Sequence, residues 1–228
     1  MLVVRKKIKN LNLTVSPPDG RVRVSVPLRV NDRDVREFIL SRYDWIKKYQ
    51  SRIREQPGPL QYKFVSGEDH YLWGQRCRLE VFERAGKHSV GVSSGGRLCM
   101  FVKPNTTRAN RQKVLTEFYR AEMKKRLPDL ITKWEAIIGV QVSEWGVKKM
   151  KTRWGSCNVK ARRIWLNLEL AKRPLECLEA ILVHEMVHLL ERLHNKRFYG
   201  YMDQFMPGWR KYREMLDRAP WAEGQRGY

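Results

Sequence analysis

Two histidines and a glutamate lie close together in the segment Val183-His-Glu-Met-Val-His188. Apolar residues spaced for a helix lead into it, so His184 and His188 are expected one turn apart on the same helical face. Two imidazoles placed in this way can bind one tetrahedral metal ion, most commonly Zn²⁺. Glu185 is then placed to act as general base when water attacks a carbonyl. The segment therefore predicts zinc-dependent hydrolysis, with a single zinc ion in each chain.

His194 is the expected third metal ligand, because it follows His188 at the six-residue spacing that metzincin peptidases use. On an unbroken helix its side chain would point roughly 100° away from the other two histidines. The helix must therefore end or unwind before His194, and Asn195 is a candidate left-handed cap. Glu191 is the competing ligand, but it lies about 10 Å along the helix axis from His184. We assign Glu191 a supporting role, such as orienting a ligand imidazole.

The histidine segment needs a helix to hold it, and Pro174 stands where such a helix can begin. An earlier helix is predicted from Arg108 to Trp134, with Pro128 as a point where it can kink. Between the two helices, Val140–Val142 and Arg163–Leu168 are predicted as extended segments. These elements make up a mainly helical region around the histidines.

The N-terminal part is predicted to be mostly β-structure. Leu11–Val15 and Val22–Val26 alternate apolar and polar residues, and the turn-forming Ser16–Gly20 joins them into a hairpin. One helix is predicted from the apolar spacing between Val35 and Ile46, and it is ended by Gln56–Leu60. Further strands are predicted at His70–Trp73, Cys77–Phe82, Ser89–Val92 and Leu98–Val102.

These assignments predict an α+β fold in two parts. Residues 1–105 form a β-rich N-terminal region with one helix, and residues 106–228 form the catalytic region. The turn residues Pro104-Asn-Thr-Thr107 mark the boundary. A chain of 228 residues of which 42% are hydrophobic can bury a core in either part.

The net charge is unusually high. The chain has 46 Lys and Arg against 24 Asp and Glu, a formal charge of +22. The excess is +11 on each side of Thr107, so no single basic tail accounts for it. A field of this size attracts polyanions, and non-specific nucleic-acid binding is one interpretation. A solvated basic surface without such a role is the other.

The remaining composition points to a soluble cytoplasmic protein. The four cysteines are far apart, none falls in a CxxC pair, and their number does not suggest a disulfide scaffold. The first residues contain no apolar run that could serve as a signal-peptide core. No segment has the uncharged apolar length that a membrane span requires.

Several other polar residues could take part in the chemistry. Arg153 could bind a substrate carboxylate or phosphate, or brace its own loop by pairing with an acidic neighbour. Asn167 is the polar residue of an apolar segment and must make a specific hydrogen bond, either to substrate or to backbone. Cys157 could reach the metal as a thiolate or be a small buried thiol. Three tyrosines are candidates for stabilising the transition state, namely Tyr199, Tyr201 and Tyr212.

The sequence resembles the YgjP-like zinc metallopeptidases, which are related to the WLM and SprT-like groups. The resemblance rests on Thr152-Arg-Trp-Gly-Ser-Cys157, Ile164-Trp-Leu-Asn-Leu168, Pro174, the histidine segment, and Leu193-His-Asn-Lys-Arg-Phe198. It implies a compact zincin-type region in which His184, His188 and His194 bind zinc and Glu185 is the base. It also implies that a hairpin over 153–168 lies beside the cleft, where its edge strand could bind an extended peptide.

The resemblance also bears on substrates, because the related groups include proteases that act on proteins attached to DNA. Protein substrates near nucleic acid are therefore one hypothesis. A basic nucleic-acid-binding protein with a structural or vestigial metal site is the main alternative, and a metal-dependent amidase acting on a small molecule is another. Nickel or cobalt could replace zinc at a site of three histidines.

Overall fold

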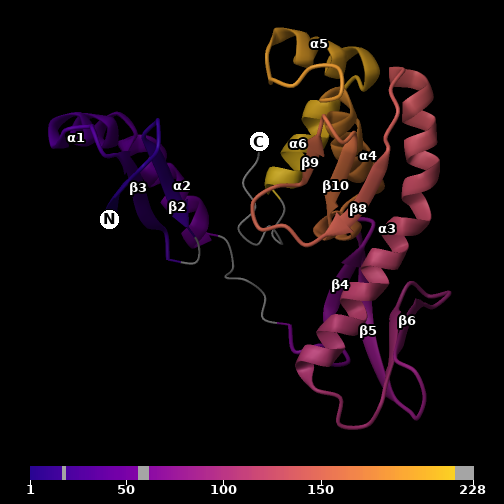
Figure 1. The fold of residues 1–228 in the computed structure, drawn as a ribbon. Helices are drawn as coiled ribbons and strands as arrows, with labels where there is room; N and C mark the ends of the chain where they lie inside the picture. The colour runs from indigo at the N-terminus through magenta and orange to yellow at the C-terminus, as the bar shows by residue number, and fades with distance from the viewer. Residues whose placement is uncertain (17–18, 56–61, 219–228) are drawn as a thin grey trace. The chain divides into compact units, whose positions relative to one another are not determined.

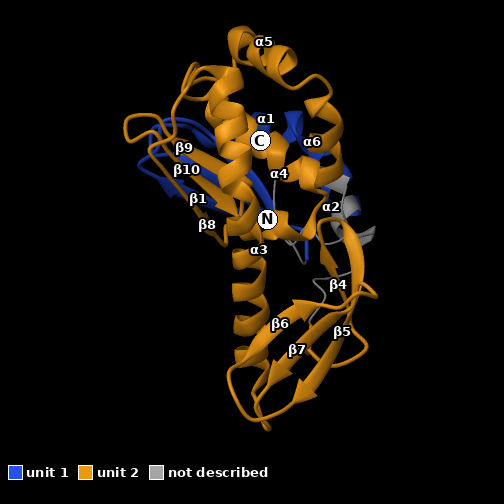
Figure 2. Ribbon diagram, turned by 90° about the vertical axis from the view of Figure 1, so that its right-hand side faces the viewer, with its two compact units in different colours: residues 1–61 blue, residues 62–228 orange. Residues whose placement is uncertain are grey.

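The computed structural model covers residues 1–228 and describes all of them except 17–18, 56–61 and 219–228 (Figure 1). The chain divides into two compact units, residues 1–61 and residues 62–228 (Figure 2). The boundary expected near residue 105 falls inside the second unit. A functional division at that point stays a prediction.

The first unit is a small sheet with two helices. Its strands are β1 (Leu2–Lys6), β2 (Asn12–Ser16) and β3 (Arg21–Pro27), in the order β1-β3-β2. The predicted hairpin is the antiparallel β2–β3 pair, whereas β1, which runs parallel to β3, was not predicted. The strands bury alternate valines, as a sheet covered on one face requires, namely Val15, Val22, Val24 and Val26.

The prediction of a single helix in this unit is wrong, because the structure has two helices there. They are α1 (Asp32–Ser41) and α2 (Tyr43–Glu55). Between them Arg42 leaves the helical conformation, with φ −110° and ψ 7°. The hydroxyl of Ser41 donates to the carbonyl of Phe38 at 2.8 Å, a local hydrogen bond that competes with helix continuation. The helix end expected at Gln56–Leu60 lies outside the described residues.

The second unit begins with a four-stranded sheet in the order β4-β5-β7-β6. All four strands were predicted: β4 (Asp69–Leu72), β5 (Gln75–Glu83), β6 (Ser89–Val92) and β7 (Leu98–Val102). The long helix α3 (Arg108–Ile138) follows, and it runs past this sheet to the C-terminal helices (Figures 1 and 2).

Helix α3 is fixed at both ends by its sequence. The side chain of Thr107 accepts a hydrogen bond from the N–H of Asn110 (3.3 Å), and Gly139 ends the helix with a left-handed φ of 74°. The helix continues through Pro128. Its buried side chains recur mostly every fourth residue: Leu115, Tyr119, Met123, Leu127, Ile131, Trp134 and Ile138.

A second sheet of this unit lies beside the histidine region. It has the order β8-β10-β9, with β8 (Glu144–Lys148), β9 (Gly155–Asn158) and β10 (Arg163–Asn167). The antiparallel β9–β10 pair is the hairpin that the family resemblance implied. The extended segment predicted at Val140–Val142 is not part of the sheet, because the N–H of Val142 donates to the carboxylate of Glu135 at 2.6 Å.

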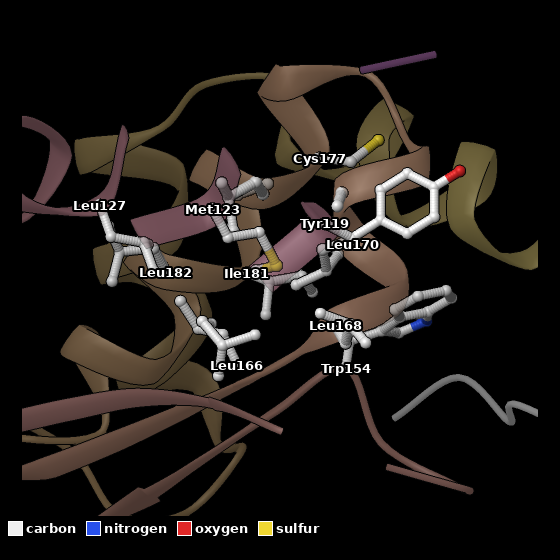
Figure 3. Close-up of a cluster of buried hydrophobic side chains, with 14 of the residues drawn as sticks. Tyr119, Met123, Leu127, Trp154, Leu166, Leu168, Leu170, Cys177, Ile181 and Leu182 are labelled. Carbon is white, nitrogen blue, oxygen red and sulfur yellow. The ribbon is translucent and has the colours of Figure 1, made fainter. Parts of the chain in front are cut away.

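The chain ends in the 3₁₀ helix η1 (Leu168–Lys172) and the helices α4 (Leu175–Val187), α5 (Lys196–Phe205) and α6 (Trp209–Arg218). Pro174 precedes α4, as predicted. Helix α4 is buried on nearly all sides, and Figure 3 shows its Ile181 and Leu182 in the core with Met123, Leu127 and Leu166. A helix that is apolar around its circumference has to lie inside the protein.

The predicted α+β class is confirmed, since the strands lie mostly in the N-terminal half and the helices follow. Among the described residues, no helix combines the length and apolarity needed to cross a bilayer.

Candidate metal centre

Helix α4 ends at the histidine segment. Its last turn carries His184 and Glu185, and the helix ends at His188. The Nε2 atom of His194 lies 3.0 Å from Nε2 of His184 and 3.1 Å from Nε2 of His188. The structure thus brings together the three histidines expected as metal ligands, with their ligand atoms within 4.8 Å of one another.

The chain leaves the helix before His194, as the geometry required. Asn195, however, is not the left-handed cap that was expected, since its φ and ψ are −102° and −175°. Its side chain instead accepts a hydrogen bond from the N–H of Phe198 at 3.0 Å and caps the start of α5. Asn is among the best residues for an N-cap, which explains why it serves the following helix.

Phe198 packs against all three histidines. It is fully buried, and its ring centroid lies 4.7 Å from those of His188 and His194 and 4.9 Å from that of His184. Because Asn195 fixes the first turn of α5, it also fixes the position of this ring. The ring in turn limits the orientations that the three imidazoles can adopt.

The main chain of Glu191 orients His188. Its carbonyl oxygen lies 3.1 Å from Nδ1 of His188. A carbonyl only accepts hydrogen bonds, so Nδ1 must carry the proton and Nε2 keeps its lone pair. The orienting role expected of Glu191 thus falls to its backbone. Its carboxylate accepts from the N–H of Leu193 at 3.1 Å.

Two of the three nitrogen separations match those around a bound metal ion, and the third is within 4.8 Å. A tetrahedral ion with Zn–N bonds of 2.0–2.1 Å holds its ligand nitrogens about 3.3 Å apart, close to the 3.0 and 3.1 Å separations seen here. A shared cation could accept the Nε2 lone pairs of all three imidazoles, because each presents this atom to the others. Among the described residues, this is the group of His, Cys, Asp and Glu side chains placed to hold a metal.

The protonation state of the three histidines also suits metal binding, because their lowered pKa values keep the imidazoles neutral. Burial lowers the pKa of His184 to about 3, and the charges of His188, His194 and Arg213 act in the same direction. Burial is also the main cause of the lowered pKa values of His188 and His194. Neutral imidazoles are the form that binds metal. His184 is buried, His188 half-buried and His194 exposed, so the centre is accessible from the side of His194.

Glu185 lies directly under strand β9. The glutamate is 1% exposed, and a Cβ atom added to Gly155 would lie only 2.6 Å from its Oε1 and 2.8 Å from its Cγ. Only glycine therefore lets the strand come this close to the carboxylate. The contact places β9, the outer strand of its sheet, beside the proposed base.

We expect Gly155→Ala to reduce hydrolysis of a peptide by roughly a hundredfold, because either Glu185 or the strand must move by up to about 1 Å. Metal content should stay unchanged, since the histidines are not touched. Gly91→Ala in strand β6 is the matched control, because a Cβ atom there meets nothing within 4 Å. Equal kinetics for the two variants would show that the Gly155 contact has no role.

Asn167, one of two residues expected to bind substrate, is fully buried. Its Nδ2 donates to the carbonyls of Met150 (3.0 Å) and Arg153 (2.7 Å). Its Oδ1 accepts from the N–H groups of Met150 (3.3 Å) and Glu169 (3.2 Å). These four bonds use its full capacity, so Asn167 holds the 150–153 loop in place and has no atom left for a substrate.

Asn167→Ala should lower the free energy of unfolding by about 2–4 kcal/mol, because it leaves buried backbone groups without partners. Urea denaturation measures this loss. Asn158→Ala is the control: Asn158 is exposed and its side chain accepts a single bond, from the N–H of Ala161 at 3.1 Å. The control should cost less than about 1 kcal/mol. Similar losses in both variants would contradict this account of Asn167.

Arg153 and Cys157 flank Gly155 in the same hairpin. Arg153, the other residue expected to bind substrate, is exposed just before β9, and its carbonyl is held by Asn167. Burial, helped by the charge of Glu185, raises the pKa of Cys157 to about 11. Cys157 is not among the side chains that converge with the three histidines. Its placement favours the small thiol over a thiolate bound to the metal.

Helix α6 contributes a cation that was not predicted. Arg213 is half-buried on the face of α6 that also carries Trp209 and Leu216, and α6 packs on α4. Its charge contributes to the lowered pKa values of His184 and His194. The spacing 209, 213, 216 on an amphipathic helix is the signal that could have revealed it.

The three candidate tyrosines are not equivalent. Tyr199 stacks on His194, with ring centroids 6.3 Å apart. The hydroxyl of Tyr201 accepts hydrogen bonds from Arg197. Tyr212 presents its backbone carbonyl to the thiol of Cys177 at 3.9 Å. Tyr199 therefore contacts the histidine cluster.

Three converging imidazoles next to a buried glutamate in an α+β fold are typical of metal-dependent hydrolases. Comparison with known protein families identifies the family to which this chain belongs. The YgjP-like metallopeptidase domain matches residues 9–219, and the chain belongs to this family. Membership confirms the resemblance seen in the sequence and makes the protein a metallopeptidase by family.

Among solved structures, the chain is similar to the crystal structure of the metallopeptidase zymogen of Pyrococcus abyssi abylysin. The identity is 24% over 40% of this chain and 89% of that chain, with a TM-score of 0.36. No curated protein matches the chain significantly.

Proposed function

We propose that this protein is a zinc-dependent peptidase of the HExxH type, in which His184, His188 and His194 bind the ion and Glu185 is the general base. The observation that carries the proposal is the convergence of three imidazole nitrogens beside a buried carboxylate. Family membership supports peptide bonds as the substrate. A purely structural metal site has no use for the glutamate next to it.

When bound, a zinc ion supplies Lewis acidity for the carbonyl and for water. The chain itself supplies the proton transfer: Glu185 accepts a proton from the attacking water and passes it to the leaving amine. Gly155 keeps the carboxylate next to β9, and the carbonyl of Glu191 keeps Nε2 of His188 free. Tyr199, whose ring stacks on His194, and Arg213, whose charge acts on His184, are our candidates for stabilising negative charge on the carbonyl oxygen.

Strand β9 is the proposed substrate-binding edge. It is the outer strand of its sheet and touches Glu185 through Gly155. An extended peptide can pair with such an edge through main-chain hydrogen bonds. Pairing would bring a peptide bond past the base without requiring a particular side chain.

Zinc removal tests the proposal. The full chain should hydrolyse an unfolded protein or a labelled peptide, lose that activity after chelation, and regain it when zinc is returned. Hydrolysis of small amides without peptides would favour the amidase reading. No hydrolysis of any amide by the zinc-loaded protein would favour a binding protein with a structural or vestigial site.

The charge of the chain supports a second, narrower candidate function. A net charge of +22 favours substrates that are associated with nucleic acid. Cleavage of a DNA-bound protein should then rise with added DNA and weaken as salt is raised. Cleavage that does not respond to DNA or to salt would remove this candidate.

The four cysteines of the chain are all free thiols, which fits the reducing cytoplasm that we propose as its location.

A further inference from the structure

The sheet beside the histidine centre carries charge of one sign. Between Trp145 and Leu168 the chain has seven basic residues and no Asp or Glu. The chain as a whole has 24 acidic residues, so their absence from this stretch is local. The cations are Lys148, Lys149, Lys151, Arg153, Lys160, Arg162 and Arg163.

Three of these cations have partners within the same chain. Arg163 pairs with Glu144 at 3.2 Å. The Nε atom of Arg162 donates to the carbonyl of Gln141 at 2.7 Å, and the ammonium of Lys148 lies 4.7 Å from the ring centroid of Trp165. The other four are exposed, and within the described part of the chain no carboxylate pairs with them. They are Lys149, Lys151, Arg153 and Lys160.

The four available cations stand at the two ends of the β9 edge. Arg153 precedes Gly155 by two residues, about 7 Å of extended chain, and Gly155 touches the proposed base. Lys160 follows at the far end, in the turn to β10. The strand between them, Gly155-Ser-Cys-Asn158, is uncharged. A peptide paired with β9 would therefore meet cations on both sides of its central residues.

The loop that carries the first group of cations has a fixed shape. Asn167 binds the backbone of Met150 and Arg153, which surround Lys151 in the sequence. A loop held in this way loses less conformational entropy when it binds a ligand. The backbone that carries Lys151 and Arg153 is therefore held in place before a ligand binds.

We propose that this edge selects extended peptide segments with acidic residues on both sides of the bond to be cleaved. The proposal rests on the proposed peptidase function and names its substrate class. A peptide is favoured over nucleic acid because its extended backbone repeats N–H and C=O groups at the spacing that pairs with a strand edge. The uncharged strand between the cations also matches a neutral segment around the scissile bond.

Binding measured by fluorescence anisotropy tests this selection without requiring turnover. The full-length protein would be titrated into a labelled peptide with glutamates at both ends and neutral residues between, and into its glutamine twin. The glutamate peptide should bind about tenfold more tightly, since several partly exposed charge pairs each contribute less than about 1 kcal/mol. The preference should shrink as salt is raised.

Charge-reversal variants locate the site. Combined Lys149→Glu, Lys151→Glu and Arg153→Glu should abolish the preference. The matched control makes the same charge change at Lys87, Lys103 and Lys124, which are exposed and lie outside the 145–168 stretch. The control should keep the preference, and circular dichroism shows that both variants are folded.

Equal losses in both variants would overturn the proposal, because general electrostatic attraction would then suffice. A DNA oligonucleotide that depends on the same three cations, with no preference between the two peptides, would assign the surface to nucleic acid instead. Acidic-peptide preference without any hydrolysis would contradict the proposed function and support the binding surface. Hydrolysis without a preference for the acidic peptide would support the proposed function and contradict the proposed binding surface.

Discussion

Glu185→Gln should abolish nearly all peptide hydrolysis while leaving the metal in place. A general base contributes about 10² to 10⁴ in rate, so kcat should fall by that factor. Glutamine has nearly the same shape and fits beside Gly155, where the glutamate is 1% exposed. It cannot accept the proton from water. The measurement combines steady-state kinetics with elemental analysis of the same preparation.

Glu179→Gln provides a matched control on the same helix. The carboxylate of Glu179 accepts from Lys133 Nζ at 2.7 Å and from Trp134 Nε1 at 2.8 Å. A glutamine there still accepts from Trp134, so activity and metal content should be close to those of the wild type. Turnover that survives in Glu185→Gln would rule out the proposed base.

The helix that carries the site was the most predictable part of the fold. Pro174 and the apolar residues after it specify α4 through local rules, and the strands of the β4–β7 sheet follow from alternation in the same way. The break at Arg42 could not be predicted from the apolar spacing, because the residues on both sides of it continue the helical pattern. There a local hydrogen bond of Ser41 opposes that pattern.

Within the candidate site, spacing predicts the histidines but not their surroundings. The contact between Gly155 and Glu185 joins residues from a strand and a helix that only the tertiary fold brings together. The backbone carbonyl of Glu191 cannot be recognised from a side-chain type. Asn167 was identified as an unusual polar residue, yet the choice between substrate and backbone depended on the loop it binds.

His184→Ala should remove the metal from the protein. The wild type is expected to contain about one zinc ion per chain and the variant close to none, because the variant keeps only two of the three protein ligands of a catalytic zinc site. Elemental analysis after dialysis measures this directly. His88→Ala is the control, since His88 is not among the residues that cluster at the site.

The same change should remove the stabilisation that zinc gives to the folded protein. An ion that binds only the folded state adds about 2.7 kcal/mol when its concentration is a hundredfold above the Kd, so added zinc should raise the Tm of the wild type. The Tm of His184→Ala should not respond to added zinc.

Comparing His194→Ala with Glu191→Gln identifies the third ligand. If His194 binds the ion, its variant loses the zinc response and Glu191→Gln keeps it, because the backbone carbonyl that orients His188 is unchanged. A zinc response that persists in His184→Ala would mean that the ion binds elsewhere and would contradict the proposed centre.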